Sequence, residues 1–156
     1  MNKLPFTKKQ IIDLFKKQNK IISASELIDL KSAEGRFLSI DLNSKINLPP
    51  FNNSAVDGYA LHMNDLKNNK ILYCKRRIAA GDKKNIKIKQ GEAVRIFTGA
   101  KMPVNSSTVV MQENTFRKES KVKILKAPRI GDNSRIKGED IKKNQKKLTK
   151  GSKINQ

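Results

Sequence analysis

The sequence has few cysteines, histidines and aromatic residues, few acids, and no long apolar run. Its 156 residues include one cysteine, one histidine and no tryptophan. Because Cys74 is alone, it cannot form an internal disulfide, and with His62 it cannot complete a zinc centre. No apolar run approaches the roughly 20 residues that cross a bilayer, and the first residues lack a signal-peptide core. We therefore expect a cytoplasmic protein without a membrane partner, Cys74 as a buried apolar side chain, and no role for His62.

Positive charge is abundant, with 34 Lys and Arg residues against 14 acids and a formal net charge of +20. Clustered cations bind nucleic-acid phosphates by releasing counterions, so a polyanion is one candidate partner. The cations are mostly lysine and come with many Asn and Ile, a mixture that an AT-rich genome produces whatever the function. The eight Phe and Tyr residues offer few stacking surfaces, and no common nucleic-acid-binding motif occurs. A non-enzymatic basic module that binds nucleic acid or another polyanion is therefore kept as the alternative function.

The first 45 residues predict short helices. A capping-box spacing begins at Thr7, and the four apolar residues that follow it lie on one helical face, which predicts an amphipathic helix over 7–19. Its apolar stripe is narrow, so the helix needs another surface to pack on. We expect a brief strand over 26–31 and a second short helix that Ser32 caps and that runs through Leu38.

From residue 46 the pattern becomes β-like, with short apolar runs separated by Gly, Pro, Asn and Asp turns. This spacing predicts a compact, mainly β unit over 46–141, followed by a lysine-rich tail. Together with the helices before it, the unit makes the fold class α+β. The expected strands cover residues 71–75, 86–88, 93–97, 108–112 and 122–125.

Two windows, 47–61 and 102–116, contain no Lys or Arg. Buried strands and tight turns exclude lysine, and this explains the apolar residues in both windows. It does not explain Asn53 and Asp57, or Thr98 just before the second window, because polar side chains in such segments need partners or a task. These three residues are therefore candidates for a functional site.

The two windows resemble motifs of a known family. Asn47–Leu61 (NLPPFNNSAVDGYAL) resembles the "PPFDNSAMDGYA" motif, and Gly91–Glu113 resembles the "G.a.RI.TGAp.P.GadtVV..E" motif, of the molybdopterin molybdenumtransferase family, called MoeA in bacteria. Three shorter pieces follow the family in the same order: GRFL at 35–38, AGD at 80–82 and RIKGEDI at 135–141. Five ordered motifs make the chain similar to the beginning of such an enzyme.

The resemblance implies a domain organisation. Family members begin with an elongated domain built from two chain segments, with a mainly β domain inserted between them. In this chain the helix would cover 1–20, the elongated linker-type domain 21–45 and 142–156, and the inserted domain 46–141. Family members continue into a pterin-binding α/β domain and a C-terminal β domain. The resemblance implies that this chain is a fragment or truncated member, and that its first helix would pack on the absent pterin-binding domain.

The resemblance also implies an activity. Family enzymes insert molybdenum, delivered as molybdate, into adenylylated molybdopterin and release AMP with a divalent cation such as Mg²⁺, in molybdenum cofactor biosynthesis. They act as dimers, with each site formed between the pterin-binding domain of one subunit and the first two domains of the other. The chain alone is then expected to be inactive without a homodimeric or separate partner that carries the pterin-binding domain. A non-functional remnant is a third interpretation.

Three residues match positions where the family places functional groups. By resemblance, Asp57, Thr98 and Asp140 are the candidate catalytic residues. Asp57 and Asp140 can help to hold Mg²⁺, which prefers one or two carboxylates together with waters and phosphates. Either carboxylate can alternatively position the attacking water as a base. The plain structural interpretation is that Asp57 only bonds the backbone of its own Asp-Gly turn.

The candidate ligand-binding residues lie around these positions. Thr98 and the glycine after it, Gly99, can offer a hydroxyl and backbone N–H groups to an oxyanion. Arg95 can pair with a phosphate or point outward into solvent. Asn53 and Ser54 can line the site or simply hold the turn.

The chain also departs from the family pattern in ways that remove acids. Asn52 replaces a common aspartate, Lys101 replaces a proline, and residues 105–107 (Asn-Ser-Ser) replace a Gly-Ala-Asp run. These changes lower the expected metal affinity.

Overall fold

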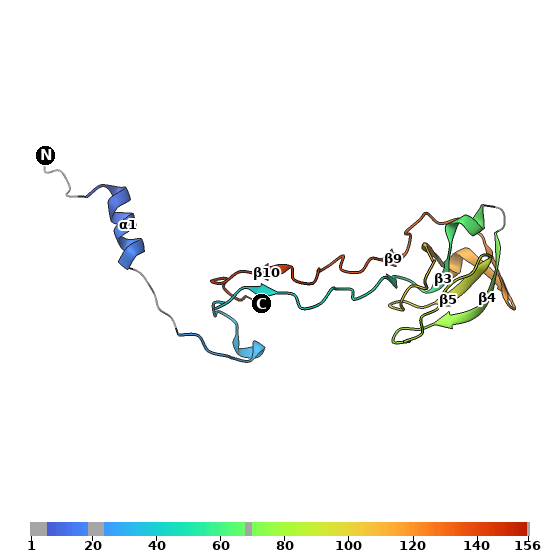
Figure 1. The fold of residues 1–156 in the computed structure, drawn as a ribbon, viewed down its shortest axis with the longest axis horizontal. Coiled ribbons are helices and arrows are strands. Elements are labelled where there is room, and N and C mark those ends of the chain that lie inside the picture. Colours follow the sequence, from blue (N-terminus) through green and yellow to red (C-terminus); the bar gives the residue numbers. More distant parts are fainter. Residues whose placement is uncertain (1–5, 19–23, 68–69, 156) are drawn as a thin grey trace. The chain divides into compact units, whose positions relative to one another are not determined.

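The computed structural model describes residues 6–18, 24–67 and 70–155. The chain divides into two compact units, one formed by Met1–Ile40 with Thr149–Gln156 and the other by Asp41–Leu148 (Figure 1). The fold is α+β with mostly strands, as expected. The expected three-part domain division stays a prediction. No helix in the described part of the chain is long and apolar enough to cross a membrane.

In the first unit, helix α1 (Lys8–Gln18) confirms the expected N-terminal helix. The capping box is present, because Gln10 N donates to Thr7 Oγ1 at 3.3 Å and Thr7 N donates to Gln10 Oε1 at 2.8 Å. The apolar side chains of the helix are exposed, Phe15 to 58%. The last residue of the expected helix, Asn19, lies outside the described residues.

The expected second helix and the expected strand before it are wrong. Residues 24–29 form no helix or strand, and only the 3-10 turn η1 (Leu30–Ser32) follows. Instead of continuing a helix, Phe37 forms an antiparallel bridge with Lys153. Because the end of the chain supplies backbone partners to residues 35–38, pairing distant in sequence overrides the local helical pattern.

The second unit begins and ends with two extended segments that run antiparallel (Figure 1). Strand β1 (Leu42–Asn43) pairs with β10 (Lys146–Leu148), and β2 (Asn53–Ser54) pairs with β9 (Ser134–Arg135). An isolated bridge joins Leu48 and Ile141 between these pairs. The pairing therefore brings the first motif window next to the RIKGEDI segment.

The part of the chain that connects these two segments forms a six-stranded sheet with the order β6-β3-β5-β4-β8-β7. Its neighbouring strands are antiparallel except β4 and β5, which are parallel. Four of the five expected strands are confirmed within a few residues. The run 86–88 is not a strand and forms only a bridge between Lys87 and Val104. The strand bounds are β3 (Gly58–Leu61), β4 (Ile71–Ile78), β5 (Glu92–Ile96), β6 (Thr108–Met111), β7 (Thr115–Lys118) and β8 (Lys121–Ile124).

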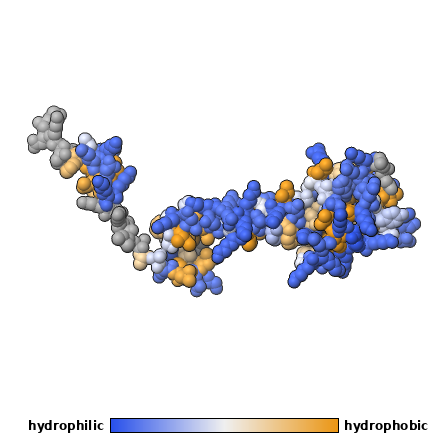
Figure 2. All heavy atoms as spheres, viewed as in Figure 1, coloured by the Kyte–Doolittle hydropathy of each residue, from blue (hydrophilic) through white to orange (hydrophobic). Residues whose placement is uncertain are grey.

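Both faces of the sheet bury apolar side chains. Residues alternate between two clusters, so that Tyr59 and Leu61 join one cluster while Ala60 joins the other. Cys74 is 1% exposed in the first cluster, which confirms it as a buried side chain. Around this core the visible surface is mostly hydrophilic (Figure 2). The core therefore fixes the strand ends on which the candidate site residues sit.

Two further 3-10 turns follow strands of the sheet. They are η2 (Met63–Leu66) after β3 and η3 (Gln112–Asn114) after β6. His62 caps the first of them by accepting a hydrogen bond from Asn64 N at Nδ1. This contact gives His62 a local structural task.

Candidate functional site

Asp57 and Thr98 form a hydrogen-bonded pair. Asp57 Oδ1 accepts both the Thr98 backbone N–H and the Thr98 hydroxyl, each at 2.8 Å. Gly58 is paired with Ile96 in the sheet, so the start of β3 and the end of β5 lie together and carry these two side chains. Asp57 therefore does more than close its own turn, and the interpretation that it bonds only its own backbone is wrong.

Thr98 lowers the pKa of Asp57 below its ordinary value. The main cause is the backbone N–H of Thr98, and its hydroxyl and the positive charge of Arg95 act in the same direction, while burial opposes them. These contacts favour the ionised carboxylate, so Asp57 is a fixed negative charge near neutral pH. A carboxylate with a lowered pKa is a weak proton acceptor. The pair is therefore better suited to orienting a hydrogen-bond donor than to removing its proton.

Replacing Thr98 with valine is expected to raise the pKa of Asp57, because the hydroxyl donor is lost while the backbone N–H remains. Since the folded pKa lies below 3.8, the pair stabilises the fold above that pH, and this stability is lost as pH falls through the folded value. The variant should therefore lose less stability on acidification. An NMR titration of the Asp57 carboxyl carbon measures the pKa. Thr98→Ser is the control, because serine keeps the hydroxyl donor and should keep the lowered pKa of Asp57. An unchanged pKa in the valine variant would contradict the role of the hydroxyl.

Arg95 is held by contacts within the protein and is half-buried. Its guanidinium lies over the rings of Tyr59 and Phe97, at 5.1 and 4.8 Å from their centroids. It also donates to Gly58 O at 3.4 Å and to Gln112 Oε1. Arg95 therefore does not point freely into solvent, and it stabilises the turn that carries Asp57. Its expected contact with a phosphate stays a prediction.

Ser54 holds the loop that contains Thr98. Gly99 N donates to Ser54 O at 2.8 Å, and Ser54 N donates to Ala100 O at 3.0 Å. The Ser54 hydroxyl is buried and donates to Val56 O at 2.6 Å. Ser54 is thus a structural residue of this turn, one of the two alternatives that the sequence left open.

The expected oxyanion donors of the loop are already used. The backbone N–H groups of Thr98, Gly99 and Ala100 donate to Asp57, Ser54 and Phe97 in that order. The prediction that these N–H groups face an oxyanion is therefore wrong for this conformation. Unlike these N–H groups, the side chain of Asn53 has an unused hydrogen-bonding atom: its buried Oδ1 has no partner among the described residues.

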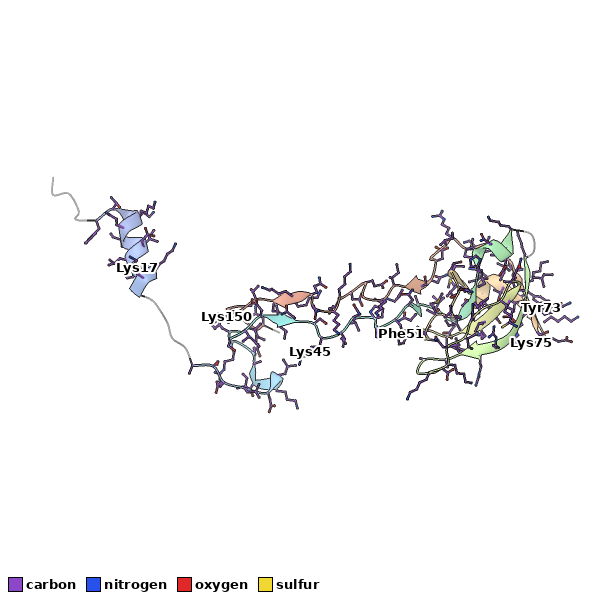
Figure 3. All side chains as sticks on the ribbon, in the orientation of Figure 1. Lys17, Lys45, Phe51, Tyr73, Lys75 and Lys150 are labelled. Atoms are coloured by element: carbon purple, nitrogen blue, oxygen red, sulfur yellow. The ribbon has the colours of Figure 1, made fainter. Side chains whose placement is uncertain are left out.

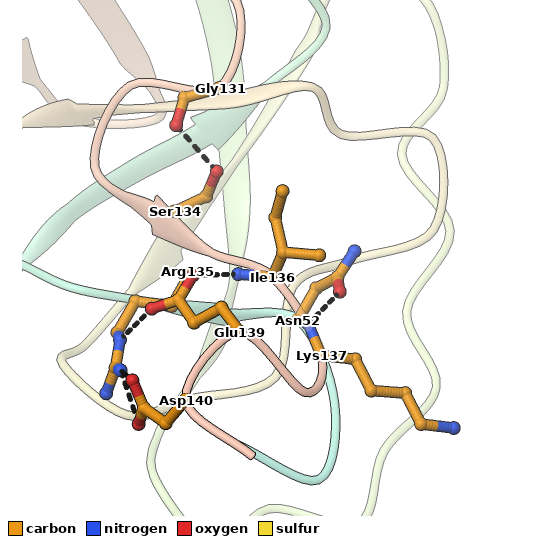
Figure 4. Close-up of polar contacts among 8 residues, drawn as sticks. All are labelled: Asn52, Gly131, Ser134, Arg135, Ile136, Lys137, Glu139 and Asp140. Atoms are coloured by element: carbon orange, nitrogen blue, oxygen red, sulfur yellow. Dashed lines mark hydrogen bonds and ion pairs between the residues drawn. The ribbon is translucent and has the colours of Figure 1, made fainter. Parts of the chain in front are cut away.

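Asp140 lies in a separate ionic cluster centred on Arg135 (Figure 4). Arg135 Nη2 donates to both carboxylate oxygens of Asp140 at 2.7 Å. Arg135 Nε donates to Glu139 Oε1 at 2.5 Å, and Ile136 N donates to Glu139 Oε2 at 2.8 Å. Among the described residues no hydrogen bond or ion pair links this cluster to Asp57 or Thr98. The structure therefore joins two of the three expected catalytic residues and not the third.

The ionic cluster changes two pKa values. The pKa of Arg135 is raised, first by its hydrogen bond to Asp140 and then by that to Glu139. The pKa of Glu139 is lowered, first by the Ile136 N–H and then by Arg135. Arg135 was not among the candidate residues, and the only sequence signal for it is an arginine four and five residues before the two acids in RIKGED. Asp140 is thus already compensated by a cation.

Asn52, which replaces a common aspartate of the family pattern, lies beside this cluster. Asn52 Oδ1 accepts a hydrogen bond from Lys137 N at 2.8 Å (Figure 4). An aspartate oxygen can accept the same bond. Asparagine at this position therefore keeps the contact and removes only the negative charge.

The residues do not fit a magnesium centre held by this chain. Asp57 Oδ1 accepts two Thr98 donors, and both oxygens of Asp140 face Arg135. The described ranges contain no group of three or more His, Cys, Asp or Glu side chains that could hold a metal. Magnesium binds through one or two carboxylates with waters and phosphates, and neither of these carboxylates has both oxygens free of protein contacts. We therefore derive no chemical step from a metal at these residues.

Comparison with known proteins identifies relatives along most of the chain. The family described as "MoeA N-terminal region (domain I and II)" matches residues 7–156. A "Molybdopterin molybdenumtransferase" of Nostoc sp. is 40% identical over 118 residues, which are 72% of this chain and 27% of that protein. The protein of the same name from Haemophilus influenzae is 34% identical over 131 residues, which are 83% of this chain and 32% of that protein.

Solved structures agree with these relatives. A molybdopterin biosynthesis MoeA protein from Pyrococcus horikoshii OT3 superposes with a TM-score of 0.76 at 31% identity, covering 83% of this chain and 36% of that one. The chain thus spans about a third of the length of these relatives. The chain belongs to the family of the MoeA N-terminal region, domains I and II.

Proposed function

We propose that this chain supplies one wall of the site of a molybdopterin molybdenumtransferase, in molybdenum cofactor biosynthesis. The reaction would insert molybdate into adenylylated molybdopterin and release AMP. The names of the relatives support this substrate class. The observation that carries the proposal is the Asp57–Thr98 pair, which joins the two segments with the strongest family motifs, 47–61 and 91–113.

Asp57 would act as a positioning residue for water. Release of AMP from a phosphoanhydride needs a water molecule aligned with the phosphorus atom. The second carboxylate oxygen of Asp57 has no hydrogen bond among the described residues and can accept one from this water. Because the pKa of Asp57 is lowered, the carboxylate orients the water without taking its proton.

Thr98 would hold the Asp57 carboxylate in one orientation. Its hydroxyl proton and its backbone N–H both point to Oδ1, so the second oxygen is not used by Thr98. The threonine oxygen keeps lone pairs that can accept a bond from the substrate. A positioned carboxylate loses little entropy when the substrate binds, and this is the contribution expected from preorganised groups.

The pterin-binding part of the site would come from another polypeptide region. The relatives are about three to four times as long as the matched segment, and the family resemblance implies that the pterin site lies in the part that this chain does not match. A second copy with that region, or a separate partner, would complete the site. Molybdate and adenylylated molybdopterin would bind between the two parts.

A chimera tests the proposal. Residues 1–156 would replace the matching segment of the Haemophilus influenzae relative, and AMP release from adenylylated molybdopterin would be measured with molybdate present. We expect the chimera to release AMP and residues 1–156 alone to release none. Turnover by the chain alone would contradict the shared site, and a folded but inactive chimera would contradict the proposed wall.

A further inference from the structure

Three neighbouring strands of the sheet carry many cations and no acid. β4 reads ILYCKRRI, β8 reads KVKI and β7 reads TFRK. They lie side by side at one edge of the sheet in the order β4-β8-β7. β4 carries three cations, β8 two and β7 two; Arg76 of β4 is paired with Glu92 of β5, and the other six form no ion pair among the described residues.

The pairing register places two aromatic residues among these cations. Tyr73 is opposite Lys121, and Lys121 is opposite Lys118. Phe116 is opposite Lys123 in the next row of the same face. Directly opposed residues share one face of a sheet, so the two rings and three lysines form one surface, which we call the β4–β8–β7 face.

The rings of this face are exposed and are not part of the core. Tyr73 is 53% and Phe116 60% exposed, while the intervening residues Leu72 and Val122 are buried on the opposite face. The Lys121 ammonium lies 5.8 Å from the centroid of the Tyr73 ring. Lys75 continues the basic row next to Tyr73 on β4 (Figure 3). An exposed aromatic ring in contact with a cation is available to a ligand that offers both a flat apolar surface and negative charge.

The spacing of the two rings selects the kind of ligand. They lie on the outer strands of a three-stranded strip, about 10 Å apart across the strands and about 7 Å apart along them. One base cannot cover both rings, so two bases of one flexible chain would be needed. The bases of a duplex are already stacked on each other, whereas a single strand can present its bases to separate rings.

We propose that the β4–β8–β7 face binds single-stranded nucleic acid, with Tyr73 and Phe116 stacking on bases and the lysines contacting phosphates. Such a combination of aromatic platforms and a basic surface gives sequence-tolerant binding. The composition of the chain pointed away from this partner because aromatic residues are few. The structure places two aromatic residues, Tyr73 and Phe116, on one basic face, and amino-acid composition alone cannot predict this arrangement. The inference does not depend on the proposed enzymatic role.

Fluorescence anisotropy with labelled oligo(dT) and oligo(U) of about 12 nucleotides tests this proposal on the full chain. We expect binding that weakens steeply between about 50 and about 200 mM salt. Tyr73→Ala and Phe116→Ala should each weaken binding about 10-fold. Lys123→Gln should lower the salt slope by about 0.7. All variants should melt at the temperature of the unmodified protein, because the changed side chains are exposed.

Two matched variants away from the face serve as controls. Phe37→Ala removes an exposed aromatic ring in the other unit, and Lys84→Gln removes an exposed cation in a loop. Neither should change the affinity. Absence of binding at low salt would overturn the proposal, as would unchanged affinity in both aromatic variants. Equal affinity for a duplex, or tighter binding to phosphatidylserine vesicles that oligonucleotides fail to displace, would also overturn it.

Discussion

The Asp57→Asn substitution is expected to lower AMP release by the chimera at least about 100-fold, as loss of a preorganised polar group in an active site does. The substitution keeps the size of the side chain and one oxygen that Thr98 can bond. It removes the negative charge that the Thr98 contacts maintain. If Asp57 orients water, the loss should appear in kcat, with little change in KM, because the substrate makes its other contacts as before.

Three variants distinguish this role from a general effect of charge. Asp29→Asn changes an exposed acid that forms no side-chain cap contact, so AMP release should stay unchanged. Asp140→Asn should cost less than Asp57→Asn, because Arg135 already compensates that carboxylate. Thr98→Val should lower kcat by a smaller factor than Asp57→Asn. Equal losses from Asp57→Asn and Asp140→Asn would contradict the assignment of the site to the Asp57–Thr98 pair.

Short sequence patterns, such as a capping box or an apolar run between turn residues, predicted the helix and most of the strands. The capping box at Thr7 places the start of α1 correctly, and its side-chain bonds lie within four residues. Strands β4, β5, β6 and β8 lie on apolar or alternating runs bounded by turn residues, the patterns that predict buried and half-buried strands. The family motifs predicted the family, because they carry residue identities in order along the chain.

Contacts between distant segments account for what the sequence did not predict. Strand β3 lies inside the turn-rich window 47–61, and it forms because β5 and β6 pair with it on both sides. Residues 35–38 pair with the end of the chain and so do not form a helix. By resemblance Asp57, Thr98 and Asp140 were predicted as residues of one site, but their contacts were not. The partners of the N–H groups in the Thr98 loop depend on Ser54 and on the loop geometry. Arg135 was not predicted, because its pairing with Glu139 and Asp140 depends on the turn over residues 137–140 and not on a regular helical spacing.

Gly58→Ala is expected to destabilise the chain by about 3 kcal/mol, at the upper end of the cost of overpacking. A Cβ at Gly58 would lie 2.0 Å from Val110 O and 2.9 Å from Val110 C. These are backbone atoms of β6, so β3 and β6 must separate and no side chain can rotate away. The separation would also strain the bond from Gln112 N to Asp57 O, measured at 3.1 Å, next to the candidate site.

Urea unfolding followed by circular dichroism measures this effect, and Gly81→Ala is the matched control. Gly81 has φ +86° and nothing within 4 Å of its added Cβ, so alanine there meets backbone strain without a clash. That strain costs about 1 to 2 kcal/mol. Gly58→Ala should therefore be the more destabilising of the two, and the NMR signature of the Asp57–Thr98 bond should change only in the Gly58 variant. If Gly58→Ala unfolds at the same urea concentration as the unmodified protein, the close approach of β3 and β6 that positions Asp57 is wrong.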